Sequence, residues 1–227
     1  MTRSRDIADS TKTLDVDGGT IKLDGNYPTG TGNVALGDTA LDSVQSAGTY
    51  NTAIGHNALT ANTTATNNVS VGAFSLALNT TGEANTAVGL AALDANTTGS
   101  NNVGLGRDAL SSNTTASSNT AVGHRASHDN TTGSGNVSMG KDAVYQTTTG
   151  NDLVGVGYEA LTRNTTGSNN VAIGKEALSR NTTASNNVAV GYQAGYTNQT
   201  GNHNTFVGRQ AGYSCNDTGN VLSLIHI

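Results

Sequence analysis

Residues 170–186 read Asn170-Val171-Ala172-Ile173-Gly174-Lys175-Glu176-Ala177-Leu178-Ser179-Arg180-Asn181-Thr182-Thr183-Ala184-Ser185-Asn186, and this 17-residue unit recurs along most of the chain. An aliphatic residue followed by glycine returns at one interval of 18 residues and then nine of 17, ending at Gly37, Gly55, Gly72, Gly89, Gly106, Gly123, Gly140, Gly157, Gly174, Gly191 and Gly208. A repeat this regular predicts a solenoid, in which each coil stacks on the one before it.

The residue types in each unit indicate β-structure. Asn, Thr and Gly are poor helix formers, and 17 residues leave no room for two helices. Val or Thr stands two residues before an aliphatic residue such as Ile173, which predicts a strand with one buried face. We expect these Val and Ile side chains, together with Ala, to form a thin interior. Turn residues after the Ala-Leu pair favour a second short strand. We therefore expect an all-β parallel β-solenoid, or β-roll, of about ten 17-residue coils.

The Ala-Leu pair suggests how copies of the chain could associate. In a strand, neighbouring side chains point to opposite faces, so an inward alanine places the next leucine outward. This predicts an exposed stripe that faces the other chains of a homotrimer, formed by Leu59, Leu93, Leu110, Leu161 and Leu178.

Two asparagine positions recur in each unit and supply turn chemistry. One opens an Asn-x-Thr turn, as at Asn181, and equivalent side chains are expected to form a hydrogen-bonded ladder along the coils. Thr147 and Leu153 replace both asparagines in a single coil, which we interpret as a locally looser coil with no catalytic role.

Composition excludes several classes of protein. Charged residues make up only 12% of the 227 residues and aromatic residues 4%, with a net charge of −5, which argues against nucleic acid as a partner. The single cysteine, Cys215, excludes an intrachain disulfide framework. No apolar run approaches the ~18 residues of a membrane span, so no membrane insertion is expected in this segment.

The repeat divides the chain into three parts. Residues 1–32 precede it and contain two alternating segments across an Asp-Gly-Gly turn, between Thr13 and Gly25, expected to be a lead-in or capping β-segment. The solenoid covers residues 33–221. Residues 222–227 leave the pattern and match the in-frame translation of a sequencing-library adapter, so they are expected to be a tail foreign to the natural protein.

Two families resemble the repeat. Val171 to Gly174, followed by Ala177, resembles the head repeats of YadA-type trimeric autotransporter adhesins, and residues 187–196 and 204–213 look like the shafts of phage tail fibres. The resemblance implies a homotrimeric fibre segment of a virion that forms or presents a surface for a host-cell glycan or protein. The head of a bacterial trimeric surface adhesin is the first alternative.

The positions after the repeat glycine are chemically varied, which is typical of a solvent-exposed side. They supply the candidate receptor-contact residues, Lys141, Tyr158, Lys175, Tyr192 and Arg209. His124 and His128 do not complete a metal site, and no catalytic, cofactor-binding or metal-binding set can be assembled, so no enzyme is expected. An ice-binding solenoid is a second alternative, although neighbours such as Thr165 and Thr166 would point to opposite faces.

Overall fold

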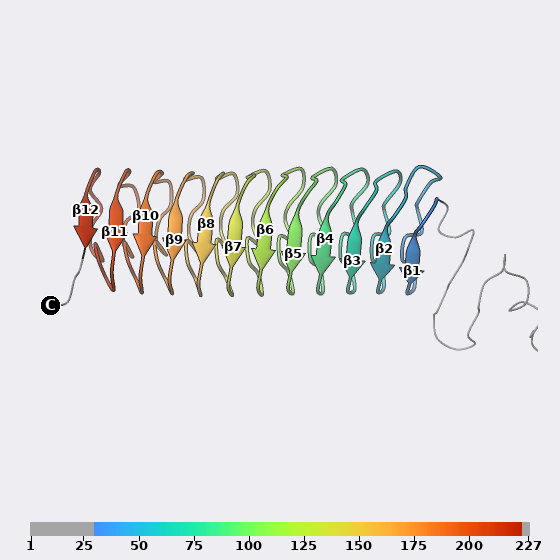
Figure 1. Ribbon diagram of the computed structural model, residues 1–227, viewed down its shortest axis with the longest axis horizontal. Coiled ribbons are helices and arrows are strands. Elements are labelled where there is room, and N and C mark those ends of the chain that lie inside the picture. The colour runs from blue at the N-terminus through green and yellow to red at the C-terminus, as the bar shows by residue number, and fades with distance from the viewer. Residues whose placement is uncertain (1–29, 224–227) are drawn as a thin grey trace, which may run out of the picture.

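The computed structural model describes residues 30–223, which form a rod built from a single stack of coils (Figure 1). Each coil contributes one three-residue strand, and the twelve strands are β1 (Val34–Leu36), β2 (Thr52–Ile54), β3 (Val69–Val71), β4 (Thr86–Val88), β5 (Val103–Leu105), β6 (Thr120–Val122), β7 (Val137–Met139), β8 (Val154–Val156), β9 (Val171–Ile173), β10 (Val188–Val190), β11 (Thr205–Val207) and β12 (Val221–Ser223).

All twelve strands pair in chain order and in parallel, which confirms the predicted parallel β-solenoid. Pairing joins equivalent residues of successive coils, as where Ala172 of β9 pairs with Ala189 of β10. This register explains why the repeat length is fixed: an inserted residue would move the side chains of a strand to the opposite face of the sheet.

The strand buries its middle residue and exposes the residues on either side. Ala172 is fully buried, whereas Ile173, directly before the repeat glycine, is 41% exposed. The prediction of one buried face is correct, but the small middle residue occupies that face, and the aliphatic residues before the glycine lie outside.

The predicted outward leucine stripe is wrong. Leu59, Leu93, Leu110, Leu161 and Leu178 are all fully buried. The Ala-Leu segment is not a second strand, because the chain there visits the left-handed region at alternate residues, with φ of 59° at Glu176 and 47° at Leu178. This alternation breaks the strand rule of opposite faces, so Ala177 and Leu178 both point into the core.

Hydrogen bonds between coils hold this unusual segment in place. The N–H of Glu176 donates to the carbonyl of Tyr158 in the preceding coil, and the N–H of Leu178 donates to that of Ala194 in the following coil. Each left-handed non-glycine residue costs about 1–2 kcal/mol, and stacking offsets this cost because the backbone polar groups find partners along the axis.

The repeat glycine is required at the corner after each strand. Gly174 has φ of 132°, and a Cβ atom there would lie 2.5 Å from the carbonyl oxygen of Gly191 in the next coil. No other residue type fits both the backbone conformation and this close approach.

Both asparagine positions form buried ladders, as predicted. In the first ladder, the Asn102 backbone N–H donates to Asn85 Oδ1 at 2.9 Å. In the second, Asn96 Nδ2 donates to Asn79 Oδ1 of the preceding coil at 2.7 Å and to the carbonyl of Gly99 in its own turn at 2.9 Å. The side-chain amides therefore satisfy turn groups that the short strands leave unpaired.

The coil with the two substituted asparagines keeps its stacking. Leu153 is fully buried, and its N–H still donates to Asn136 Oδ1 at 2.9 Å. Thr147 accepts a hydrogen bond from Asn164 Nδ2 at 3.2 Å, but Asn130 Oδ1 in the preceding coil is buried without a hydrogen-bond partner. One side-chain hydrogen bond of the second ladder is thus lost there.

The apolar core consists of two clusters, one between Ala35 and Ala126 and the other between Val144 and Ala211. They are separated by Ser127 and Ser138, whose buried hydroxyl groups lie 2.9 Å apart. The predicted capping segment between Thr13 and Gly25 lies outside the described residues. At the other end, β12 reaches Ser223, so pairing continues two residues past the predicted end of the solenoid at 221.

Candidate functional site

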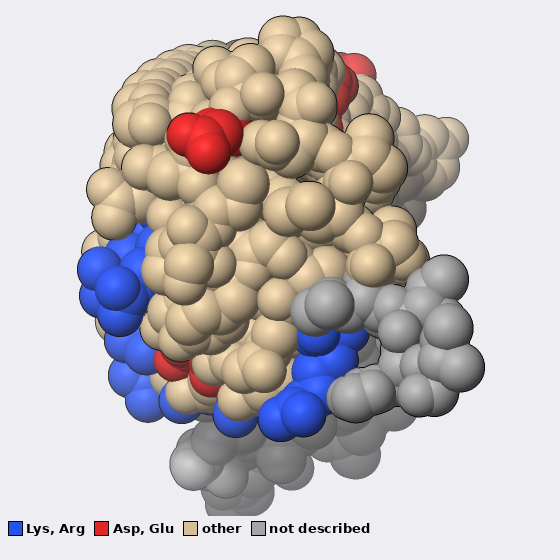
Figure 2. Space-filling view, turned by 90° about the vertical axis from the view of Figure 1, so that its left-hand side faces the viewer, with Lys and Arg blue, Asp and Glu red and all other residues tan. Residues whose placement is uncertain are grey.

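The side of the rod that follows the repeat glycine carries most of the chemically distinctive residues. We call the predicted receptor-contact residues the cation–tyrosine row: Lys141, Tyr158, Lys175, Tyr192 and Arg209. They come from five successive coils and alternate cation and ring. In the end-on view, Lys and Arg side chains gather along the left and lower rim of the rod (Figure 2).

Cation–π contacts connect this row without interruption. Lys141 Nζ lies 5.6 Å from the ring centroid of Tyr158, and Lys175 Nζ lies 5.5 Å from the same centroid and 5.9 Å from that of Tyr192. Arg209 Cζ lies 5.8 Å from the Tyr192 centroid. The structure therefore brings all five predicted residues together, and each contact of this kind contributes about 0.5–1 kcal/mol at an exposed site.

Carboxylates flank the cation–tyrosine row at the next position of its first three coils, and glutamines stand there in the last two. Asp142 Oδ2 lies 3.7 Å from Lys141 Nζ, and Glu176 Oε1 lies 3.6 Å from Lys175 Nζ. A hydrogen bond to the Glu159 carboxylate, together with its negative charge, raises the pKa of the Tyr158 hydroxyl. The two lysines of the row are thus paired with carboxylates, whereas Arg209 is followed by Gln210 and has no carboxylate oxygen within 4.0 Å among residues 30–223.

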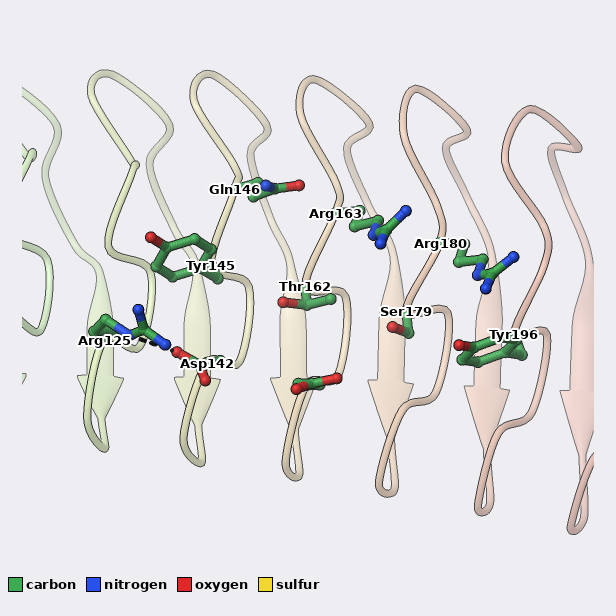
Figure 3. A pocket seen from close by; sticks show the side chains of 10 residues that line it. Arg125, Asp142, Tyr145, Gln146, Thr162, Arg163, Ser179, Arg180 and Tyr196 are labelled. Atoms are coloured by element: carbon green, nitrogen blue, oxygen red, sulfur yellow. Dashed lines mark ion pairs between the residues drawn. The ribbon is translucent and has the colours of Figure 1, made fainter.

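A groove of about 270 Å³ lies on the far side of these carboxylates (Figure 3). One wall holds Arg125, Asp142 and Glu159, which share one repeat position, and the other holds Gln146, Arg163 and Arg180. Tyr145 and Tyr196 stand at the two ends of the groove. The hydroxyl groups of Thr162 and Ser179 lie between the two walls. No aliphatic side chain lines the groove, which excludes the mostly apolar lining of a typical cofactor pocket.

One residue after the core leucine position, several coils carry an aromatic residue, and these residues form a column along the rod. The groove is an interruption of this column. Tyr145 stacks on His128 of the preceding coil at a centroid distance of 5.1 Å, and Tyr196 stacks on Tyr213 of the following coil at the same distance. The two coils between these pairs carry Thr162 and Ser179 at this position, so two ring positions are vacant. We call this column, with its gap, the aromatic column.

The arginines of the groove differ in their partners. Arg125 Nε forms an ion pair with Asp142 Oδ1 at 2.9 Å, and this carboxylate raises the pKa of the Arg125 guanidinium. Within residues 30–223, no carboxylate oxygen lies within 4.0 Å of Arg163 or Arg180. Arg180 Cζ instead lies 4.9 Å from the centroid of Tyr196, so its guanidinium is held against a ring.

Sequence reasoning missed this groove because it followed the two positions after the glycine and ignored the position after the leucine. Alignment of that column at the 17-residue period places His128, Tyr145, Thr162, Ser179, Tyr196 and Tyr213 one above another. The change from rings to small hydroxyl residues and back to rings is the signal that could have revealed the groove.

The outer face of the sheet is an apolar surface that sequence reasoning assigned to the interior. Its first column holds Val or Thr at the start of each strand, and its second holds the aliphatic residue before each glycine. In the second column Ile54 is 36% exposed, Val88 39%, Met139 42% and Val207 44%. We call these two columns the sheet face.

Neither a metal site nor a membrane span is found in the part of the chain that the structure describes. Residues 30–223 contain no group of three metal-ligating side chains, and none of their segments forms a helix long and apolar enough to cross a membrane. His128 is engaged by Asp129, whose Oδ1 lies 2.6 Å from Nδ1 of the ring.

Comparison with known proteins gives no relative: no family model, no curated protein and no solved structure matches the chain.

Proposed function

We propose that the chain is a structural and adhesive fibre segment, a tail-fibre shaft of a phage virion, that associates as a parallel homotrimer and presents its outward columns to a host-cell receptor. The observation that carries this proposal is the sheet face, a continuous apolar stripe on a rod of twelve stacked strands. Contiguous exposed apolar surface is uncommon on monomeric proteins and marks an association site.

The two columns of the sheet face favour three chains. They differ in residue type, since one mixes Val with Thr and the other holds Ile, Leu, Val or Met. Contact between unlike columns of neighbouring chains is heterologous, and such contacts close into a ring around a symmetry axis. With three parallel chains, each first column meets the second column of a neighbour, and every coil contributes equally along the rod.

The cation–tyrosine row is the first candidate for receptor contact. Its rings and charges lie on a different side of each coil from the sheet face, so association through the sheet leaves the row accessible. Tyrosine and arginine are enriched where proteins recognise partners, because they combine large contact area with polar groups.

Paired substitutions test this proposal. Lysines at Val88 and Val122, on the sheet face, place charge in the expected interface and should give a monomer by light scattering at micromolar concentration. Lysines at Thr98 and Thr132, exposed turn residues in the same part of the rod, add the same charge elsewhere and should leave a trimer. A wild-type chain that is already monomeric contradicts the proposal.

The genes that neighbour the coding sequence separate the two biological settings. Virion genes beside it would support the tail fibre, whereas a secretion signal and membrane anchor in the same reading frame would favour the bacterial adhesin. An ice-binding role finds little support, because the Oγ1 of Thr165 donates to the carbonyl of Thr182 and is not free to order water.

A further inference from the structure

The groove between the carboxylates and the aromatic column is separate from the cation–tyrosine row and from the sheet face. We propose that it binds a short acidic oligosaccharide, with a sugar carboxylate on Arg163 and Arg180 and a sugar ring against Tyr145. This inference rests on the proposed function as an adhesive segment and names the class of receptor that this part of the rod takes.

Arg180 is the strongest part of the argument. Its Cζ lies 4.9 Å from the centroid of the Tyr196 ring, a cation–π contact that uses none of its N–H groups. A guanidinium held against a ring keeps its donor fork available for a carboxylate, and such a pair forms two parallel hydrogen bonds. No carboxylate in the described residues approaches Arg180, so its donors are open to solvent or to the carboxylate of a ligand.

The neighbouring coil supplies a second cation of the same kind. Arg163 occupies the position equivalent to Arg180, one coil earlier, on the same wall of the groove (Figure 3). The contrast with Arg107 and Arg125 is informative, because each of these has a carboxylate within 3.0 Å. Two adjacent unneutralised arginines on a chain with a net charge of −5 favour an anionic ligand.

Tyr145 supplies the apolar surface that a sugar ring requires. Its ring contacts with His128 and Arg125 both come from the preceding coil. In the following coil the column continues with Thr162, which carries no ring, so the aromatic column is interrupted beside Tyr145. Aromatic rings with polar edges suit a ligand that has both apolar and hydroxyl-bearing surfaces.

The remaining lining matches the hydroxyl groups of a sugar. Thr162 and Ser179 donate and accept, and Glu159 on the opposite wall accepts. The gap from Tyr145 to Tyr196 spans three coil spacings of 5.1 Å, about 15 Å. This elongated, polar shape suits a linear saccharide better than a compact apolar molecule.

Titration of the full-length chain with defined sugars, followed by saturation-transfer NMR, tests this proposal. The probes are 3′-sialyllactose and a hyaluronan tetrasaccharide, which carry sialate and uronate carboxylates respectively, and lactose and cellotetraose serve as neutral sugars. At least one acidic probe should bind about tenfold more tightly than either neutral sugar.

Three variants locate the binding. The double change Arg163→Gln and Arg180→Gln should weaken acidic-sugar binding about tenfold or more, and Tyr145→Ala should weaken it by a similar factor. Arg107→Gln, an exposed arginine outside the groove, should have no effect. Binding that persists in the double arginine variant overturns the proposal, as does failure of both acidic probes to bind at millimolar concentration.

Two further outcomes separate this inference from the proposed function. If a tyrosine-containing acidic peptide binds through Arg180 and the sugars do not, the groove takes a protein ligand and the saccharide assignment is wrong. If the chain is monomeric but binds an acidic sugar in the groove, the fibre proposal fails and the groove assignment stands.

Discussion

The two halves of the rod share the same coil and differ most in their outward side chains. Residues 51–122 and residues 123–213 repeat the same corner glycine and both asparagine positions, which only Thr147 and Leu153 replace. The core leucine position is Leu throughout the first half and varies in the second, where it holds Ser127, Val144, Leu161, Leu178, Gly195 and Gly212. Yet among residues 30–223 every Lys and Arg except Arg107, and every Tyr except Tyr50, lies in the second half. Outward positions of the first half hold residues such as Ala73, Leu90 and Ser112.

This difference separates the residues that specify the fold from those available for binding. Inner positions stack on copies of themselves, so each is constrained by two neighbours. Outward positions meet solvent and can vary without affecting the coil. The groove and the cation–tyrosine row both arise where such variation has accumulated, and the parallel pairing of the strands continues there although Thr147 and Leu153 replace two ladder asparagines.

The largest expected effect comes from substitution of the corner glycines, and the loss of stability should be equal in both halves. Gly72→Ala and Gly174→Ala each place a Cβ 2.5 Å from a carbonyl oxygen at a φ near 130°, and each should cost about 4 kcal/mol of unfolding free energy. Urea unfolding followed by circular dichroism measures the loss.

Gly82→Ala and Gly167→Ala are the matched controls for the corner. A Cβ at these positions would also approach a carbonyl oxygen, at 2.2 Å for Gly82 and 2.1 Å for Gly167, but neither glycine has a left-handed φ. Other coils carry Ala65, Ala116 and Ala184 at this turn position, so the stack accommodates a Cβ there and these changes should cost far less. Controls as damaging as the corner changes, or halves that respond differently, would break the claim of a shared coil.

The core leucines should give the next largest effect. Leu93→Ala and Leu178→Ala, one in each half, should each cost about 3 kcal/mol, because both side chains are fully buried. Leu90→Ala, which removes a side chain that is 46% exposed, should change stability by less than about 0.5 kcal/mol. Thermal unfolding compares the three variants. If Leu93→Ala left the stability unchanged, the leucines would not be core residues.

A smaller, stabilising effect is expected where the second half departs from the first. Thr147→Asn should supply an amide donor to Asn130 Oδ1, which is buried without a hydrogen-bond partner. The free energy of unfolding, measured by urea titration, should rise by about 1 kcal/mol. Thr149→Asn, at an exposed position of the same turn, should give no gain, and an equal gain from both would mean that the ladder is not the cause.

The smallest expected effect concerns the cation–tyrosine row. Tyr158→Leu gives the second half the residue that Leu90 provides in the first. It should cost about 1 kcal/mol, since two exposed cation–π contacts of about 0.5 kcal/mol each are lost and water replaces the hydroxyl that is hydrogen-bonded to the Glu159 carboxylate. Calorimetric unfolding measures this cost. A loss as large as that of Leu178→Ala would show that the row is part of the fold.

Prediction from the sequence succeeded where a single residue type fills a column. The period, the parallel stacking and the asparagine ladders all follow from such columns. It failed at Leu178 and its equivalents, because alternation of side-chain faces assumes an extended backbone, and the left-handed φ at Glu176 and Leu178 is not evident from residue types. It also placed Ile173 and its equivalents inside, because a pattern of period two does not state which face is buried.

The candidate site was predictable only in part. The residues of the cation–tyrosine row stand at one repeat position in successive coils, so the repeat period alone predicts that they lie next to one another. The groove depends on what is missing, since it exists because Thr162 and Ser179 are small where Tyr145 and Tyr196 are large. Its two unpaired arginines become visible only when the distances to carboxylates are known.

The most direct test of the central claim is the mass of the full-length chain in solution, measured by size-exclusion chromatography with light scattering at micromolar concentration. An exposed sheet face that associates around a threefold axis predicts three times the 22.9 kDa of one chain, falling to a single chain when Val88 and Val122 are both changed to Lys. A wild-type mass of one chain, or a trimer that survives both lysines, would contradict it.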